Sequence, residues 1–268
     1  MDQLNFFEMM MPKFSVDKPI RLIELFGGIG SQTMALRNLG ADFESYRLIE
    51  YDKYPVASYN AIHGTNFEPK DITQVHGSDL GIVDTESFTY LLTYSFPCQD
   101  LSIAGKQAGM GKGTGTRSGL LWEVERLLNE VENLPQVLLM ENVPMVHAEQ
   151  NRVHFEQWIE FLRSKGYSNY WKDLNAAEYG VAQHRERCFM VSILGNYYFK
   201  FPYETKLNFC MADYLEDTVD EKYYINSEKA LNLIQELVDN GTLPSTIPTN
   251  ERTNERTNER TNERTNEQ

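Results

Sequence analysis

The chain has 268 residues, of which 41% are hydrophobic, and it carries a formal net charge of -14 with a pI of about 4.8. This is enough material for one large folded domain, or for a domain with a small appendage. The acidic balance argues against a protein that coats nucleic acid nonspecifically, because phosphate binding requires clustered lysine and arginine.

The apolar segments are too short to cross a membrane, since none approaches the roughly 18 residues that a spanning helix needs. The first residues also lack the basic flank and cleavage site of a signal peptide, so we expect a cytoplasmic protein. The three cysteines, Cys98, Cys188 and Cys210, are widely separated. Their spacing indicates neither a disulfide framework nor a metal site of the CxxC type, and we expect no metal.

The first predicted elements are a strand, a tight turn and a helix. Residues 20–26 (IRLIELF) form a short, mostly apolar run that is typical of a buried strand. Glycines follow, and residues 31–40 (SQTMALRNLG) show a helical pattern. The alternation recurs, with further strands expected at 46–50, 89–94, 137–140 and 188–194, and helices near 54–63, 120–131 and 155–165. Repeated units of this kind predict an α/β fold with a doubly wound, mostly parallel sheet.

The last quarter of the chain has a different composition. Beyond Gly195 it becomes aromatic and acidic, and one further helix is expected at 227–239. The tail repeats Thr-Asn-Glu-Arg without an apolar residue, so we expect it to be disordered. We therefore divide the chain into a main α/β domain, an incomplete second region and a disordered repeat tail, at 1–194, 195–248 and 249–268.

The repeat has a further reading at the level of the gene. By the genetic code, the tetranucleotide AACG in tandem encodes Asn-Glu-Arg-Thr, and all three sense frames give the same cycle without a stop. Because a four-base unit does not divide by three, slippage by one unit changes the downstream frame while residues 1–248 stay intact. The repeat therefore predicts phase variation.

Several strand ends carry side chains suited to a nucleotide-like ligand. The glycine turn FGGIGS opens a helix whose amino end can face a ligand, although it is not the spaced GxGxxG and a plain turn is the alternative. Glu50 is placed to accept hydrogen bonds from ribose hydroxyls, and Tyr51 is placed to stack on a base. Asp71 and Ile72 are placed to bind an adenine amino group and ring. A solvated acidic loop is the alternative for Glu50.

Cys98 ends an apolar strand, and a loop dense in glycine, serine and lysine follows it. A thiol in this position is placed like a nucleophile on a closing loop. A lone cysteine is more often an inert core residue, but the loop context outweighs that alternative.

Glu141 ends another predicted strand, and it lies at the same sheet edge as Cys98 if the two strands are parallel. Partial burial would keep its carboxyl protonated and able to donate a hydrogen bond. In an extended segment QHRER, the side chains of Gln183, Arg185 and Arg187 face one common site. Guanidinium groups suit oxygen atoms of a base or phosphate, and a surface charge run is the alternative.

In order and spacing, ELFGGIGS, IEYD, KDI, SFPCQ, MENV and QHRER resemble the successive motifs of the bacterial and phage cytosine-5 DNA methyltransferases. The resemblance covers about residues 20 to 195. It implies the Rossmann-like fold of S-adenosylmethionine-dependent methyltransferases, a catalytic and cofactor-binding role for residues 1–194, and membership of a restriction-modification system.

The resemblance also implies roles for individual residues. S-adenosylmethionine would contact Phe26, Gly28, Gly30, Glu50, Tyr51, Asp71, Ile72, Pro97 and Leu120. A cytosine flipped out of duplex DNA would be attacked at C6 by Cys98, with Glu141 on its N3 edge and Arg185 and Arg187 holding the base. The remaining DNA contacts would come from Gln99, Ser102, Arg117 and Gln183.

The resemblance weakens at the carboxyl end, where neither a full-length target-recognition segment nor the late Gly-Asn motif is found. Three interpretations follow: an out-of-frame product of a phase-variable gene, a split enzyme completed by a second polypeptide, or a complete short protein with reduced function. A non-enzymatic fragment that binds cofactor or a partner is a further alternative. A small-molecule methyltransferase or a nucleotide oxidoreductase needs none of this motif set, whereas a cytosine-5 methyltransferase acting on transfer RNA shares it.

Overall fold

The computed structural model describes residues 11–98, 110–112, 118–208, 210–214, 216, 218–223 and 227–242. The chain divides into two compact units, one formed by Met1–Tyr179 and His184–Thr205, the other by Gly180–Gln183 and Lys206–Gln268. Among the described residues, no helix combines the length and apolar character needed to span a membrane.

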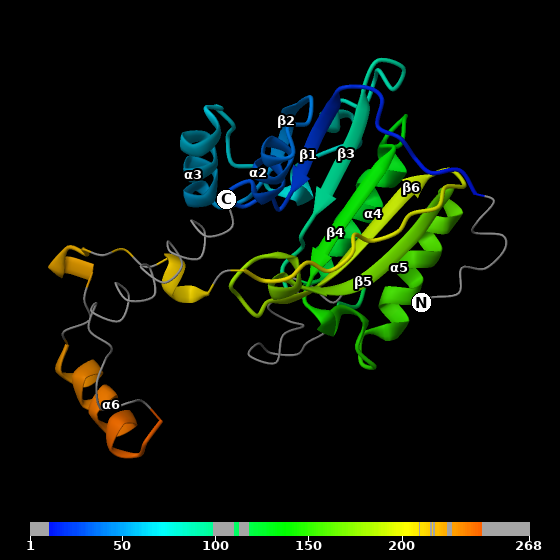
Figure 1. Cartoon of the computed structure of the whole chain (residues 1–268). Coiled ribbons are helices and arrows are strands. Elements are labelled where there is room, and N and C mark those ends of the chain that lie inside the picture. The colour runs from blue at the N-terminus through cyan, green and yellow to red at the C-terminus, as the bar shows by residue number, and fades with distance from the viewer. Residues whose placement is uncertain are drawn as a thin grey trace, which may run out of the picture. The chain divides into compact units, whose positions relative to one another are not determined.

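The first unit is built on a sheet in which six strands can be described, in the order β2-β1-β3-β4-β6-β5 (Figure 1). Strands β1 to β4 are parallel, whereas β6 runs antiparallel to β4 and to β5. The predicted mostly parallel, doubly wound sheet is confirmed. The strands are β1 (Ile20–Leu25), β2 (Phe43–Ile49), β3 (Thr89–Tyr94), β4 (Val137–Asn142), β5 (Tyr167–Asn175) and β6 (Glu186–Leu194).

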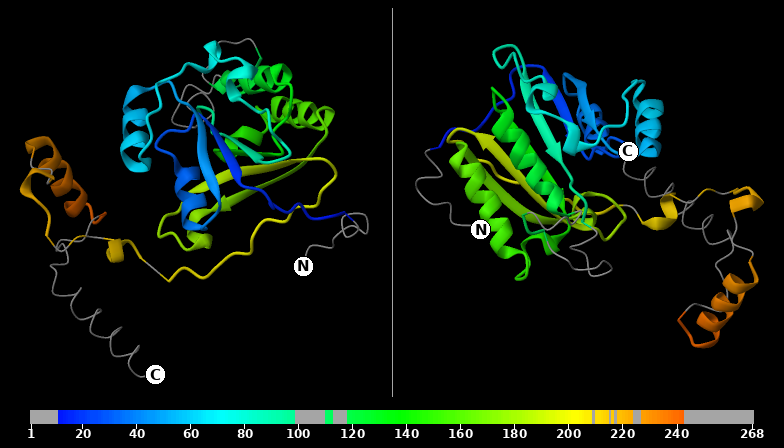
Figure 2. Two further views of the ribbon diagram at one scale, coloured as in Figure 1. Left: turned by 90° about the horizontal axis from the view of Figure 1, so that it is seen from above. Right: turned by 180° about the vertical axis from the view of Figure 1, so that it is seen from behind.

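Helices connect the parallel strands. The chain crosses from β1 to β2 in one direction along the sheet, through α2, and from β3 to β4 in the other direction, through α4. Because such crossovers are right-handed, α2 and α4 lie on opposite faces of the sheet, as Figure 2 shows. The α-helices of this unit are α2 (Ser31–Asn38), α3 (Lys53–His63), α4 (Leu121–Glu130) and α5 (Arg152–Ser164). Short 3-10 turns lie between them: η1 (Ile72–Gln74), η2 (Gly77–Leu80), η3 (Ser118–Leu120), η4 (Pro144–His147) and η5 (Ala176–Tyr179).

The core lies between the sheet and the helices α4 and α5. Helix α4 buries Leu121, Val124 and Leu128, which are spaced by three and four residues and so share one helix face. Helix α5 buries Phe155, Trp158 and Leu162 on the same spacing. Trp158 also donates from Nε1 to Tyr94 Oη at 3.0 Å, which fixes α5 against the end of β3.

Two features of the sheet differ from the sequence prediction. Strand β5 was not predicted, because it pairs only with β6 and its residues show no simple alternation of buried and exposed positions. The extended segment expected from Gln183 to Arg187 is wrong in its first half. Strand β6 begins at Glu186, residues 182–183 form a bend, and Gln183 belongs to the second unit.

The residues just beyond β6 pair within the first unit. Tyr198 N donates to Pro12 O at 2.9 Å, and Thr205 N donates to Glu178 O at 2.7 Å. The second unit contains η6 (Met211–Tyr214), η7 (Glu221–Tyr223) and α6 (Glu228–Asp239). Helix α6 falls where a helix was predicted, and the repeat tail at 249–268 lies outside the described residues.

Candidate active site

The carboxyl ends of the parallel strands lie at one edge of the sheet. The aligned pairs Leu25 with Ile49, Leu25 with Tyr94, and Tyr94 with Met140 bring these ends level. The residues that follow each strand therefore gather at a shared edge, where open α/β sheets bind their ligands. All the motif residues from Phe26 to Glu141 that can be described follow or end one of these strands, or lie on the loops that connect them.

The turn after β1 has an unusual backbone. Phe26 has φ of 57°, which is rare for a residue with a side chain, while Gly28 and Gly30 have φ of 55° and 83°. A Cβ atom at Gly30 would lie 2.5 Å from His63 Nε2 and 2.6 Å from Tyr59 Cε2. Glycine is therefore required at Gly30 on two grounds, conformation and space. Local strain of this kind is often found at binding sites.

Glu50 joins the next loop to this turn. Its carboxylate accepts hydrogen bonds from Gly28 N at 3.1 Å and from Asp52 N at 3.0 Å, and Lys70 N donates to Glu50 O at 2.8 Å. The side chain is thus held at the strand edge by backbone groups on both sides of it. Tyr51, the next residue, is 76% exposed.

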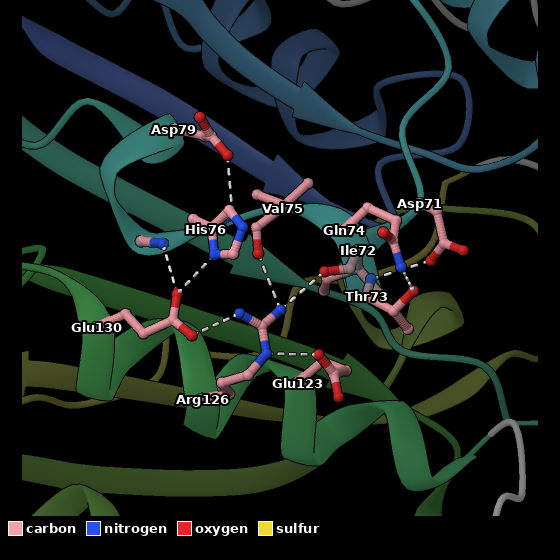
Figure 3. Close-up of polar contacts among 11 residues, drawn as sticks. Asp71, Ile72, Thr73, Gln74, Val75, His76, Asp79, Glu123, Arg126 and Glu130 are labelled. Carbon is pink, nitrogen blue, oxygen red and sulfur yellow. Dashed lines mark hydrogen bonds and ion pairs between the residues drawn. The ribbon is translucent and has the colours of Figure 1, made fainter.

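Asp71 and Ile72 begin the turn η1, and a helix on the same side of the sheet holds that turn in place (Figure 3). Asp71 Oδ1 accepts from Thr73 N at 3.0 Å, while the Ile72 side chain is buried. Arg126 of α4 donates from Nη2 to Ile72 O at 3.0 Å and to Val75 O at 2.9 Å.

Arg126 is itself oriented by two acidic side chains on its own helix. Its Nε lies 2.8 Å from Glu123 Oε2 and its Nη1 lies 2.8 Å from Glu130 Oε1. Sequence reasoning missed this arginine. The signal was present in the spacing, since glutamates three residues before and four residues after an arginine lie on its side of a helix.

A buried carboxyl group lies beneath the glycine turn. Glu24 is fully buried and accepts from Tyr59 Oη at 2.5 Å and from Thr33 Oγ1 at 2.8 Å. Burial raises the pKa of Glu24, although hydrogen bonds from Tyr59 and Thr33 act to lower it. Its second oxygen, Oε1, has no hydrogen-bond partner among the described residues. This group ties β1 to α2 and α3, and sequence reasoning did not single it out.

Cys98 is half-buried, and the backbone before it is anchored twice. Asn142 Nδ2 of β4 donates to Phe96 O at 3.0 Å, and Ser118 Oγ donates to Pro97 O at 2.8 Å. Leu120, the last residue of η3, packs against the hydrophobic core. Gln99, Ser102 and Arg117, predicted to contact DNA, lie outside the described residues.

Glu141 forms an ion pair with Arg187, in which Arg187 Nε lies 3.1 Å from Glu141 Oε1. The two side chains are 24% and 22% exposed, so the pair is partly shielded from water but open on one side. Arg185 is exposed, and its backbone N donates to Asn175 Oδ1 at 3.2 Å. The structure thus brings Arg187, rather than Arg185, onto Glu141. Because Gln183 lies in the second unit, it is not placed relative to either arginine.

Comparison with known proteins decides the family. The family model of the C-5 cytosine-specific DNA methylases matches residues 20–268. The chain belongs to the C-5 cytosine-specific DNA methylase family. The resemblance drawn from six motifs is confirmed at this level, and with it the assignment of the chain to a family of DNA methyltransferases.

Individual relatives of this methylase agree. It is 31% identical to the type II methyltransferase M2.ScrFI of Lactococcus lactis subsp. cremoris, over 78% of this chain and 71% of that protein. It is 34% identical to the orphan methyltransferase M.SssI of Spiroplasma monobiae, over 81% of this chain and 70% of that protein. Both relatives are methyltransferases, in agreement with the family assigned to this chain.

Solved structures show the same fold. The crystal structure of the S. pombe Dnmt2 methyltransferase matches 82% of this chain and 66% of its own, with a TM-score of 0.62 and 23% identity. The Entamoeba histolytica methyltransferase EhMeth matches with a TM-score of 0.64 and 17% identity, over 83% of this chain and 67% of its own. At these identities the likeness concerns the fold of the methylase and not its substrate.

Proposed function

We propose that this methylase transfers a methyl group from S-adenosylmethionine to C5 of a cytosine flipped out of duplex DNA, through a covalent bond to Cys98. The observation that carries the proposal is the arrangement at one sheet edge of the anchored Cys98 segment and the Glu141–Arg187 pair. The Cys98 segment comes after β3, and Glu141 lies on the neighbouring parallel strand β4. Strand β6, on the other side of β4, carries Arg187.

The described residues suit S-adenosylmethionine at the adjoining edge. Glu50 offers carboxylate oxygens as acceptors for ribose hydroxyls, and the glycine turn lets a ligand approach the backbone closely. Asp71 and Ile72 offer a carboxylate and an apolar side chain to an adenine ring, and we propose that Tyr51, Pro97 and Leu120 complete the cofactor pocket.

In the reaction, the thiolate of Cys98 attacks C6 of the cytosine, so that a sulfur–carbon bond forms and the ring electrons move toward C5. Glu141 binds the N3 edge, and Arg187, supported by Arg185, binds the carbonyl oxygen. S-adenosylmethionine, held by the residues named above, would supply an electrophilic methyl group to C5 and would leave as S-adenosylhomocysteine. Loss of the C5 proton to a base then expels Cys98 and restores the aromatic ring.

The ion pair between Glu141 and Arg187 gives this mechanism a specific requirement. A carboxyl group that donates a hydrogen bond to N3 must carry a proton, and Arg187 must turn toward the base. Arg187 contacts Glu141 through Nε at 3.1 Å, while its Nη1 donates to Glu186 O at 2.7 Å, so one contact to the carboxylate must break for such a move. We propose that the incoming base separates the pair.

The test is methyl transfer to duplex DNA with labelled S-adenosylmethionine, performed with the chain alone and together with any polypeptide encoded downstream. Duplex DNA with 5-fluorocytosine should trap the protein in a complex that survives denaturation, because fluorine cannot leave as a proton does. Cys98→Ala should abolish the trapped complex, while Cys210→Ala, at an exposed cysteine, should leave it unchanged. Label that enters transfer RNA instead of DNA would reject the proposed substrate.

We further propose that the Thr-Asn-Glu-Arg repeat is encoded by tandem AACG units, which makes the gene phase-variable. The amino-acid repeat supports this, since it is the translation of such a tract in every frame. Sequencing many clones of one culture should reveal tracts that differ by single units. A tract built of varied codons, with no change in length between clones, would reject the proposal.

A further inference from the structure

Three side chains that bind metals in proteins converge beside η4. They are His147 of η4, Asp173 of β5 and Cys188 of β6, and one ligand atom from each lies within 4.8 Å of the others. His147 Nε2 is 2.9 Å from Asp173 Oδ2. In a tetrahedral zinc site, bonds of 2.0 to 2.3 Å separate neighbouring ligand atoms by about 3.3 to 3.8 Å. Small side-chain movements would bring the three atoms to that spacing.

The strand register builds this cluster on the face of the sheet opposite to the ion pair of Glu141 and Arg187. Cys188 is aligned with Asp173 on one side and with Asn142 on the other, so these three side chains share a face. Glu141 is aligned with Phe189, one residue along, which points to the other face. The cluster therefore lies on the other face of the sheet from the proposed catalytic pair, although the charge of Glu141 also acts on Cys188.

The charges at the cluster suit a divalent cation. Burial, and then the neighbouring carboxylate of Asp173, raise the pKa of the Cys188 thiol, so the thiol keeps its proton while no cation is near. A zinc ion reverses this preference, because it binds the thiolate directly. One thiolate, one carboxylate and a neutral imidazole would then balance the two charges of the metal.

Aromatic side chains restrict one of the three candidate ligands. The His147 ring packs on Trp171 at 4.7 Å and on Phe155 at 5.9 Å between ring centres, which restricts its orientation. Cys188 is fully buried, whereas the side chains of His147 and Asp173 are 24% and 28% exposed. Water therefore reaches one side of the cluster, which provides an entry path and a fourth ligand.

We propose that His147, Asp173 and Cys188 form a zinc site that fastens η4 to strands β5 and β6. The site would act on structure, since η4 directly follows the strand that carries Glu141 and Asn142. The sequence did not indicate it, because the first two ligands are 26 residues apart and follow no metal-binding spacing. The proposal does not depend on the proposed methyl transfer.

The test uses the full chain, purified without metal and titrated with Zn²⁺ against a chromophoric chelator, and with Co²⁺ as a spectroscopic probe. We expect one Zn²⁺ per chain and a thiolate-to-cobalt charge-transfer band. Cys188→Ser should abolish the band, whereas Cys98→Ser and Cys210→Ser should retain it. A band that is absent from the wild type, or that persists in Cys188→Ser, would overturn the proposal.

Two further variants guard against a cysteine variant that does not fold. Asp173→Asn and His147→Gln keep the thiol and nearly the same shape, and each should weaken Zn²⁺ binding at least tenfold. Zinc should also raise the melting temperature of the wild type and not that of Asp173→Asn, because a ligand stabilises the folded state that binds it. Equal zinc affinity in the wild type and both variants would reject the site.

Discussion

Asn142 and Phe96 are joined by a buried hydrogen bond, in which Asn142 Nδ2 donates to the backbone oxygen of Phe96 at 3.0 Å. The Oδ1 atom of the same side chain accepts from Val143 N at 2.9 Å. One amide thus fixes the end of β4 and the segment that leads into Cys98. The residue positions both of the proposed catalytic side chains without a place in the reaction itself.

Replacement of Asn142 by alanine should therefore lower both the stability of the protein and the rate of methyl transfer. The Phe96 carbonyl and the Val143 amide would lose their partner, and each loss would lower the free energy of unfolding by about 1 to 3 kcal/mol. Displacement of Cys98 should lower the rate of methyl transfer on the order of 100-fold. The measurement is single-turnover kinetics together with urea unfolding.

Asn151→Ala is the matched control for Asn142→Ala. Asn151 is also buried, and its Nδ2 donates to a backbone oxygen, that of Met145, at 2.8 Å. It should lose less stability, since Asn151 Oδ1 has no partner among the described residues, and it should keep most of its single-turnover rate. If both variants lose the same fraction of activity, Asn142 has only a general structural role.

Arg126→Gln should weaken the binding of S-adenosylmethionine by about tenfold and leave the single-turnover rate at saturation nearly unchanged. The variant removes the two hydrogen bonds that hold the Asp71–Ile72 turn, each worth roughly 1.5 to 3 kcal/mol when the donor is charged. Equilibrium dialysis measures the change. Arg152→Gln, at an exposed arginine on α5, is the control and should bind the cofactor normally; equal affinities of the two variants would contradict the prediction.

Gly30→Ala should destabilise the protein more than Gly40→Ala does. Both glycines have positive φ, 83° and 66°, so each substitution carries a conformational cost of about 1 to 2 kcal/mol. Only at Gly30 does the new Cβ meet other atoms, whereas nothing lies within 4 Å of it at Gly40. Thermal unfolding compares the two, and a melting temperature no lower for Gly30→Ala would show that the turn relaxes freely.

The pH dependence of stability should carry the signature of Glu24. Because burial raises the pKa of this carboxyl above its ordinary value of 4.5, the folded state holds the proton more tightly than the unfolded state. The contribution of Glu24 to the free energy of unfolding is therefore complete below the ordinary pKa and is lost as the pH rises through the raised pKa. The loss has a slope of at most about 1.4 kcal/mol per pH unit.

Glu24→Gln removes this titration, so its stability should rise relative to the wild type as the pH increases across that window. Urea unfolding of both proteins, from the ordinary glutamate pKa up to neutrality, measures the difference. Parallel stability curves would show that Glu24 titrates as it does in the unfolded chain.

The sequence by itself determined the fold class, the family and most of the groups at the sheet edge. Buried parallel strands are continuous apolar runs, so β1, β3 and β4 are visible locally. The motif residues Glu50 and Glu141 directly follow or end such runs, and Cys98 lies four residues beyond the end of β3. Which edge they share then follows from the parallel arrangement alone.

Only the tertiary structure decided how those groups are held. The contacts of Arg126 with Ile72, of Asn142 with Phe96 and of Arg187 with Glu141 join segments that are far apart in sequence, so they depend on helix placement and strand register. Register also set the meeting of His147, Asp173 and Cys188, through a strand, β5, whose pattern gave no local signal. Interactions along one strand or helix depend only on the residues of that element, so a local pattern reveals them. Interactions between elements depend on how the whole chain packs.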